Sequence, residues 1–241
     1  MKEFKPSQKV DQAGNYLPFH GVTVISSIHD DHDIWKAVND GIRSCPLVME
    51  YYSILPCDSY HMTVMDLYTK KFDGGECWEQ FITEKTSFFR ALNETIHDRN
   101  FTFNPEITIS RSHVTSIISL LVQLDSEQQS KIRDIAEKFN LTVKIPKHLH
   151  VTLGHLNKEI SAETLTMIQT QVQAVLENTE NLFNNLISLQ APQLCYFHDM
   201  TAFIPWNGDI NPFMSSRSLG VWGRTESPET TPLYHDGLKP L

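Results

Sequence analysis

The sequence predicts an α+β fold of two similar halves that meet at a central cleft. Two segments rich in β-branched and apolar residues, 60–67 and 149–156, share a His, a Thr two positions later with apolar residues on either side, and a Leu six positions after the His. Each half also follows one order of strand, helix, motif strand and helix, which indicates a repeated unit. We therefore expect two lobes related by a pseudo-twofold axis, at about 20–100 and 101–206 with elements free to swap between them. Mainly antiparallel sheets are expected to line the cleft, with helices outside.

The first half begins with a polar arm at residues 1–18. Strands are expected at 21–28 and 50–55, which are short runs of apolar and β-branched residues. Between them, Asp33 is placed to cap a helix. After Gly75, large apolar residues recur at helical spacing, which predicts one long helix. They are Trp78, Phe81, Phe88, Leu92 and Ile96.

The second half shows the same alternation. A helix whose capping box is formed by Ser126 and Gln129 is expected in its middle, and Ser161 is placed to cap a later helix. The expected strands, apart from the motif strand, are 106–110, 117–124, 143–145, 186–189, 194–197 and 201–204.

Glycine and proline interrupt the pattern from Asn207 onwards. We therefore expect residues 1–206 to form a single bilobal domain and residues 207–241 to form an extended tail.

The two motif strands carry the residues that are candidates for catalysis and ligand binding. Successive side chains of a strand point to opposite faces, so positions two apart share a face. His61 with Thr63, and His150 with Thr152, are each expected to present an imidazole and a hydroxyl together. Two such strands side by side would surround a site the size of a phosphate.

A third copy of the short pattern, His113-Val114-Thr115, shows that His-x-Thr alone is weak. This copy has polar flanks, lacks the apolar residue after Thr and has Ser119 in place of the Leu. We interpret it as a strand end or turn.

The pair His61-Met62-Thr63-Val64 and His150-Val151-Thr152-Leu153 resembles the two motifs of the 2H phosphoesterase superfamily, which includes 2′,5′ RNA ligase-like proteins and cyclic nucleotide phosphodiesterases. The resemblance covers about residues 21–206. It implies a bilobal 2H phosphoesterase-like fold and phosphoric diester hydrolysis that needs no metal and no cofactor.

The same resemblance implies the roles of the site residues. His61 and His150 would be the catalytic acid/base pair, and Thr63 and Thr152 would hold phosphate oxygens. Many relatives carry a basic residue soon after the second motif, and His155 stands nearby here. Because an imidazole titrates near neutrality, that contact is expected to be weaker or pH-dependent.

Other residues beside the motifs add to the expected site. Tyr60 precedes the first motif and is a candidate for stacking on a base. Lys144, Lys147 and His148 precede the second motif and either add local positive charge or form a solvated turn around Pro146.

Composition limits the partners. A net charge of −9 argues against extended nucleic-acid binding, which needs basic surface, but allows a nucleotide or an RNA end as a small substrate. The N-terminus lacks the apolar core of a signal peptide, and no run reaches the length of a membrane span. Four cysteines without metal or Cys-x-x-Cys spacing indicate a reducing compartment. We therefore expect a cytoplasmic monomer that does not bind membranes.

Three alternatives stay open at this stage. A metal-dependent hydrolase could use the His cluster, with His148, His155, His113, Asp66 or the segment 29–33 as ligands. A binding module could have kept the cleft without turnover. Ligation could replace hydrolysis. The sequence does not determine the exact substrate or which histidine is the acid.

Overall fold

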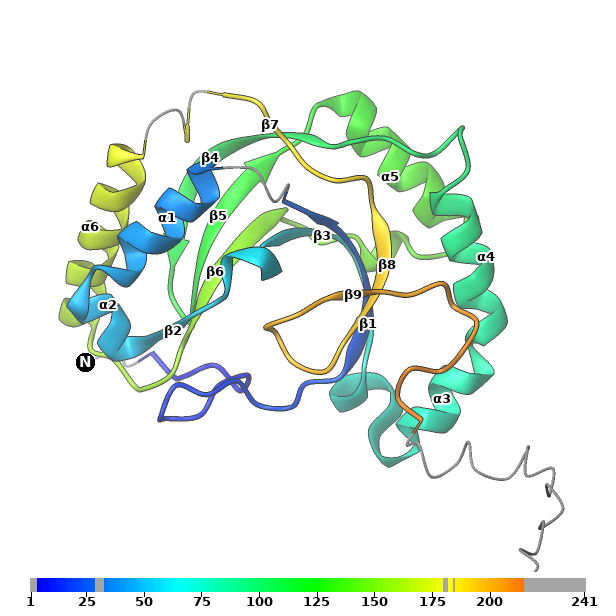
Figure 1. Cartoon of the computed structure of the whole chain (residues 1–241), viewed down its shortest axis with the longest axis horizontal. Coiled ribbons are helices and arrows are strands. Elements are labelled where there is room, and N and C mark those ends of the chain that lie inside the picture. The colour runs from blue at the N-terminus through cyan, green and yellow to red at the C-terminus, as the bar shows by residue number, and fades with distance from the viewer. Residues whose placement is uncertain (1–3, 29–32, 180–181, 184, 215–241) are drawn as a thin grey trace, which may run out of the picture. The chain divides into compact units, whose positions relative to one another are not determined.

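A computed structural model describes residues 4–28, 33–179, 182–183 and 185–214 of the chain (Figure 1). The chain divides into two compact units, Met1–Asn211 and Pro212–Leu241. The first unit contains all of the strands and helices discussed below. No helix in the described ranges combines the length and apolar character needed to cross a bilayer.

The described residues form one nine-stranded sheet that curls around the middle of Figure 1. Every strand pair in it is antiparallel, as expected for an α+β fold. The order is β7-β4-β5-β6-β3-β1-β8-β9, and β2 pairs with β6. The strands are β1 Gly21–Ser27, β2 Tyr52–Ile54, β3 His61–Thr69, β4 Glu106–Val114, β5 Ile117–Gln123, β6 His150–Leu156, β7 Ile187–Ser188, β8 Gln193–Phe197 and β9 Ile204–Pro205.

The two motif strands, β3 and β6, are neighbours in the centre of this sheet. The sequence β4-β5-β6 on one side is matched by β8-β1-β3 on the other, so the order of strands has the predicted pseudo-twofold arrangement. The two lobes are therefore joined edge to edge through β3 and β6. β8 and β9 lie within the range expected for the second lobe, but they continue the sheet beyond β1, so these strands belong to the first lobe.

Helices cover the sheet in two groups, seen at the left and right of Figure 1. The first group is α1 Asp33–Arg43, α2 Pro46–Tyr51 and α6 Ala162–Asn178, which contact one another. The second group is α3 Trp78–Glu84, α4 Thr86–Ile96 and α5 Ser126–Lys138. In α1, Trp35, Val38 and Ile42 lie one turn apart and are fully buried, which is the apolar face that fixes this helix.

Local chemistry explains where the elements differ from expectation. Pro46 begins α2, since its fixed φ suits the first helical turn, so residues 46–51 are helical and only Tyr52–Ile54 form a strand. The expected long helix is broken at Lys85 into α3 and α4. The expected strand 143–145 is instead a 3₁₀ turn, Thr142–Lys144.

Two helix starts illustrate capping. Asp125, and not Ser126, caps α5, because its carboxylate accepts a 2.8 Å bond from the backbone N–H of Gln128. Ser161 caps α6 as predicted, accepting a 3.1 Å bond from the N–H of Thr164.

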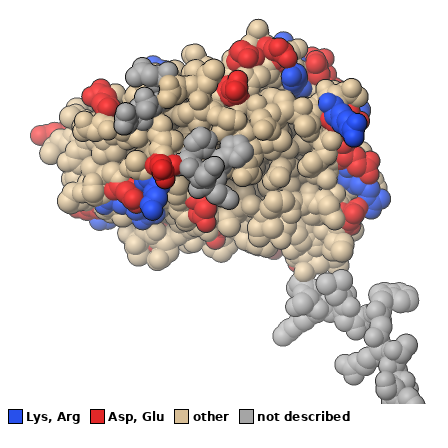
Figure 2. Space-filling view, turned by 45° about the horizontal axis from the view of Figure 1, so that its top comes forward, with Lys and Arg blue, Asp and Glu red and all other residues tan. Residues whose placement is uncertain are grey.

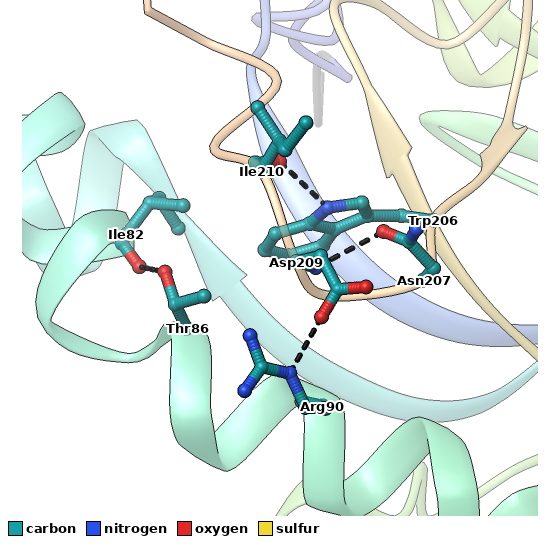
Figure 3. Close-up of polar contacts among 7 residues, drawn as sticks. All are labelled: Ile82, Thr86, Arg90, Trp206, Asn207, Asp209 and Ile210. Carbon is teal, nitrogen blue, oxygen red and sulfur yellow. Dashed lines mark hydrogen bonds and ion pairs between the residues drawn. The ribbon is translucent and has the colours of Figure 1, made fainter.

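Residues 207–211, which we expected to begin the tail, pack on α3 and α4 (Figure 3). The indole of Trp206 lies 4.8 Å from the ring of Phe89 and donates to the carbonyl of Ile210. Gly208 has a φ of +83°, and a Cβ there would lie 2.6 Å from the backbone nitrogen of Arg90. This close approach requires glycine. The remainder of the expected tail, 215–241, is outside the described residues.

This anchor predicts unequal effects of two neighbouring substitutions. Trp206→Ala removes a buried ring and should lower the free energy of unfolding by about 3–5 kcal/mol. Asp209→Ala removes a 2.5 Å ion pair with Arg90 whose side chains are about half exposed, and should cost at most about 1 kcal/mol. Urea unfolding followed by circular dichroism measures both, and equal losses would contradict this account.

Candidate active site

One cross-strand pair brings the two motifs together. Met62 of β3 lies opposite Val151 of β6, and both side chains are fully buried. Because faces alternate along a strand, the residues on either side of each point to the opposite face. That face opens into a cavity of about 460 Å³ lined by His61, Thr63, His150 and Thr152.

The antiparallel register sets how the four side chains face one another. Met62–Val151 is the recorded pair, and continuing its antiparallel register by one residue in each direction would set His61 towards Thr152 and Thr63 towards His150. Directly opposed residues have Cβ atoms about 4.5–5.5 Å apart. Two adjacent strands thus present both imidazoles and both hydroxyls to one cavity.

Backbone carbonyls orient both imidazoles in the same way. Nδ1 of His61 lies 2.8 Å from the carbonyl of Ser59, and Nδ1 of His150 lies 3.0 Å from the carbonyl of His148. A carbonyl only accepts, so the neutral tautomer of each ring carries its proton on Nδ1. The lone pair of Nε2 is then available to a ligand in the cavity.

The environment of His61 favours its neutral form. Burial lowers the pKa of His61 to about 4, against the opposing effect of the Ser59 carbonyl. The charges of Lys9 and His150 lower it further. At neutral pH His61 is therefore a free base.

Two residues predicted to bind substrate have other surroundings. Tyr60 does not line the cavity: it is fully buried, packs edge-on against Trp35 and hydrogen-bonds to Asn39. His155 borders the cavity but is only 3% exposed, and burial lowers its pKa to about 3. It stays neutral at physiological pH, so it cannot be the cationic phosphate contact.

Lys9 lines the cavity and its charge acts on His61. Sequence reasoning missed it because residues 1–18 have only the composition of a polar arm. The arm folds into a hairpin in which Val10 pairs with Tyr16. The hydroxyl of Tyr16 donates to the carbonyl of Ser53, and the hydroxyl of Ser53 donates to the carbonyl of Gly14. These bonds dock the hairpin on β2. The turn residues 11–15 were a usable signal for the hairpin, but nothing in the sequence indicated that it reaches the site.

Lys9 is half-buried in the cavity wall. Its ammonium lies 5.0 Å from the centre of the Phe19 ring, and burial lowers its pKa while the charge of Asp66 opposes that change. Lys144, a predicted source of charge, also lines the cavity and lies 3.8 Å from the Asp73 carboxylate. Lys147 and His148 do not line it.

Aromatic rings form much of the remaining wall. Phe203 lies 4.0 Å from the His61 ring, centre to centre, and 5.0 Å from Phe197. The lining aromatics are Phe19, Tyr68, Phe72, Phe197 and Phe203. A planar base could stack on this wall beside the histidines.

The third motif copy lies elsewhere, as predicted. His113 is near the end of β4, and Thr115 is in the turn before β5. Within the described ranges no three His, Cys, Asp or Glu side chains are grouped to hold a metal ion. Most of the segment 29–33 named for the metal alternative, residues 29–32, lies outside those ranges.

Comparisons with known proteins agree with this fold. Residues 9–110, which contain Lys9 and the first motif, match the 2H-phosphodiesterase family model, described as a domain of unknown function (DUF1868). An uncharacterized protein, 127L, of Invertebrate iridescent virus 6 is 24% identical over 90% of this chain and 99% of its own length.

One solved structure shares the fold. A conserved protein of unknown function, ATU0111, from Agrobacterium tumefaciens aligns with a TM-score of 0.64 at 17% identity, over 83% of this chain and 90% of its own. Usb1 of Kluyveromyces marxianus aligns more distantly, with a TM-score of 0.44 at 15% identity, over 77% of this chain and 97% of its own.

The matched residues 9–110 and the paired motifs resemble a 2H phosphoesterase-like domain. The family match and the arrangement of β3 and β6 confirm the resemblance to the 2H phosphoesterase superfamily. The second motif lies beyond the matched residues, and its place beside the first is established by the strand order.

The lowered pKa values predict an acid-sensitive fold. His61 and His155 are neutral in the native state at pH values where unfolded histidine, with a pKa near 6.5, is protonated. The unfolded state then binds more protons, so the free energy of unfolding falls as pH decreases from about 6.5 to 4. His155→Leu should make this slope shallower by about 1.4 kcal/mol per pH unit. Urea unfolding between pH 7 and 4.5 measures it, and an unchanged slope would refute the assignment.

Proposed function

We propose that the chain is a metal-independent phosphodiesterase that hydrolyses a cyclic or 2′-5′ phosphodiester of a nucleotide or an RNA end. The observation that carries the proposal is the pairing of Met62 with Val151, which sets two imidazoles and two hydroxyls around one cavity. The match of residues 9–110 to the 2H-phosphodiesterase model supports the same reaction class.

The two histidines would divide the proton transfers. His61 is held neutral, so its Nε2 would accept a proton from the attacking water. The water oxygen forms a bond to phosphorus as the bond to the leaving sugar oxygen breaks. His150, as the general acid, would give a proton to that leaving oxygen. The next turnover begins when the proton on His61 is returned to solvent and His150 is protonated again.

The hydroxyls and the lysine would stabilise the charge on phosphate. No hydrogen bond from the Thr63 or Thr152 hydroxyl to another described residue competes with a ligand. Both can therefore donate to non-bridging oxygens, where negative charge grows in the transition state. Lys9 would supply the positive charge that His155, held neutral, does not.

Hydrolysis of 2′,3′-cyclic nucleotides and a 2′-5′ dinucleotide in EDTA tests the proposal. His61→Ala and His150→Ala should each lower kcat/KM by about 10²–10⁴, the usual contribution of a general acid or base. His113→Ala is the matched control, because it removes a histidine of the same short pattern outside the cavity, and it should leave the rate within about twofold of wild type.

Other outcomes favour the alternatives. Activity lost on chelation would favour a metal-dependent hydrolase, with residues 29–32 among the candidate ligands. Tight binding of these substrates without product would favour a nucleotide- or RNA-end-binding module. Joining of RNA ends instead of hydrolysis would identify a ligase.

The role of Lys9 has its own test. Lys9→Met keeps the length of the side chain and removes its charge, and should lower kcat/KM by about 10²–10³, as loss of an oxyanion contact does. Because Lys9 lowers the pKa of His61, the acidic limb of the pH–rate profile should also move to higher pH. Lys144→Met, which removes a cation already beside Asp73, is the control and should have a smaller effect. A normal rate and an unmoved limb in Lys9→Met would exclude this role.

A further inference from the structure

A second groove, of about 610 Å³, adjoins the catalytic face of the sheet. Its walls are β4, β5, α5 and the segment 145–149 that leads directly into His150. None of its lining residues belongs to the cavity that holds the histidines.

The strand register places this groove on the same face as the site. Leu121 of β5 lies opposite His150, and Arg111 of β4 lies opposite Leu121. Directly opposed residues in antiparallel strands point to the same side of the sheet. Arg111, Leu121 and His150 therefore form one row across three strands. With neighbouring strands about 4.8 Å apart, the Cα atoms of Arg111 and His150 are about 10 Å apart.

The groove is basic although the protein is acidic. Arg111 on β4, Arg133 on α5 and Lys147 on the lead-in segment are all exposed and all line it, together with His148. No Asp or Glu is among its lining residues, and no carboxylate in the described part of the chain lies within ion-pairing distance of these three cations. Figure 2 shows one face of the molecule, on which blue and red side chains lie next to one another in several places.

We propose that this groove binds the phosphate backbone of a single-stranded oligoribonucleotide whose terminal phosphodiester occupies the catalytic cavity. The inference rests on the proposed function and deepens it, because it makes an RNA end, and not a free cyclic mononucleotide, the preferred substrate. A mononucleotide held between His61 and His150 would not extend across β5 to Arg111. A chain of nucleotides continuing along the row from His150 would place its next phosphates among the three cations.

The other lining residues suit the same ligand. Leu121, Ile132, Ile145 and Pro146 supply apolar surface between the charged groups. Such surface can pack against a sugar or the face of a base whatever the sequence, since apolar contact does not read base edges. The groove would therefore raise the affinity for longer oligonucleotides, with little preference for base identity.

Fluorescence anisotropy with a 5′-fluorescein uridine octamer ending in a 3′-phosphate tests the groove without requiring turnover. The variant Arg111→Gln/Arg133→Gln/Lys147→Gln should weaken octamer binding at least about tenfold at low salt. It should also make the slope of log K against log[salt] shallower by about 2, because each cation that contacts a phosphate of a single strand contributes about 0.7. Its loss of affinity for 2′,3′-cyclic UMP should be at least about tenfold smaller. The control Lys5→Gln/Lys36→Gln/Arg99→Gln removes the same charge from exposed positions outside both pockets and should leave both affinities unchanged.

Equal octamer affinity in the two triple variants, an unchanged salt slope, or no octamer binding by wild type would overturn the proposal. Its failure can be told from failure of the proposed function. If cyclic UMP is hydrolysed while the groove variant binds the octamer normally, the function stands and the groove assignment fails. If the groove variant loses octamer binding while no substrate is hydrolysed, the groove stands and the catalytic proposal fails.

Discussion

The contact on which the rest of the site depends is the antiparallel pairing of Met62 with Val151. It joins the two lobes edge to edge, and its two buried side chains fix which face each motif turns to the helices and which to the cavity. A slip of one residue in this register would move His61 or His150 to the opposite face, since side chains alternate with a period of two. The neighbouring pairs of β1 with β3 and β5 with β6 hold the register in place over longer runs. Backbone pairing thus determines which side chains face the cavity, independently of any ligand.

Sequence periodicity was sufficient to place the four motif residues on one face, but it could not place the residues around them. His61, Thr63, His150 and Thr152 could be placed on one face because a strand leaves no other choice for positions two apart. Tyr60 precedes the strand, where the period of two no longer applies, and it turned towards Trp35. Lys9 comes from a hairpin more than 50 residues from the first motif, and only tertiary docking brings it to the cavity.

The same limit explains which elements of the fold could be predicted from the sequence. Long periodic elements such as α6 and the motif strands were predicted from their spacing, whereas α2 and the break between α3 and α4 depend on local backbone geometry at Pro46 and Lys85. The join of both lobes in one sheet was beyond sequence reasoning, because strand neighbours far apart in the chain leave no local signal. Residues 207–211 show the same limit. They are anchored by a close backbone approach at Gly208, whereas the composition indicated only that the regular pattern ends there.

The approximate symmetry of the motifs has a consequence for regiochemistry. Two identical His-x-Thr units related by a twofold axis would treat either orientation of a cyclic phosphate alike, and would release the 2′- and 3′-monoesters without preference. The surroundings remove that equivalence: Lys9 and Phe203 lie on the side of His61, and the basic groove begins on the side of His150. Under the proposed function, a substrate would therefore enter this site with a defined polarity, and the position of the phosphate on the product would record which way the chain lay.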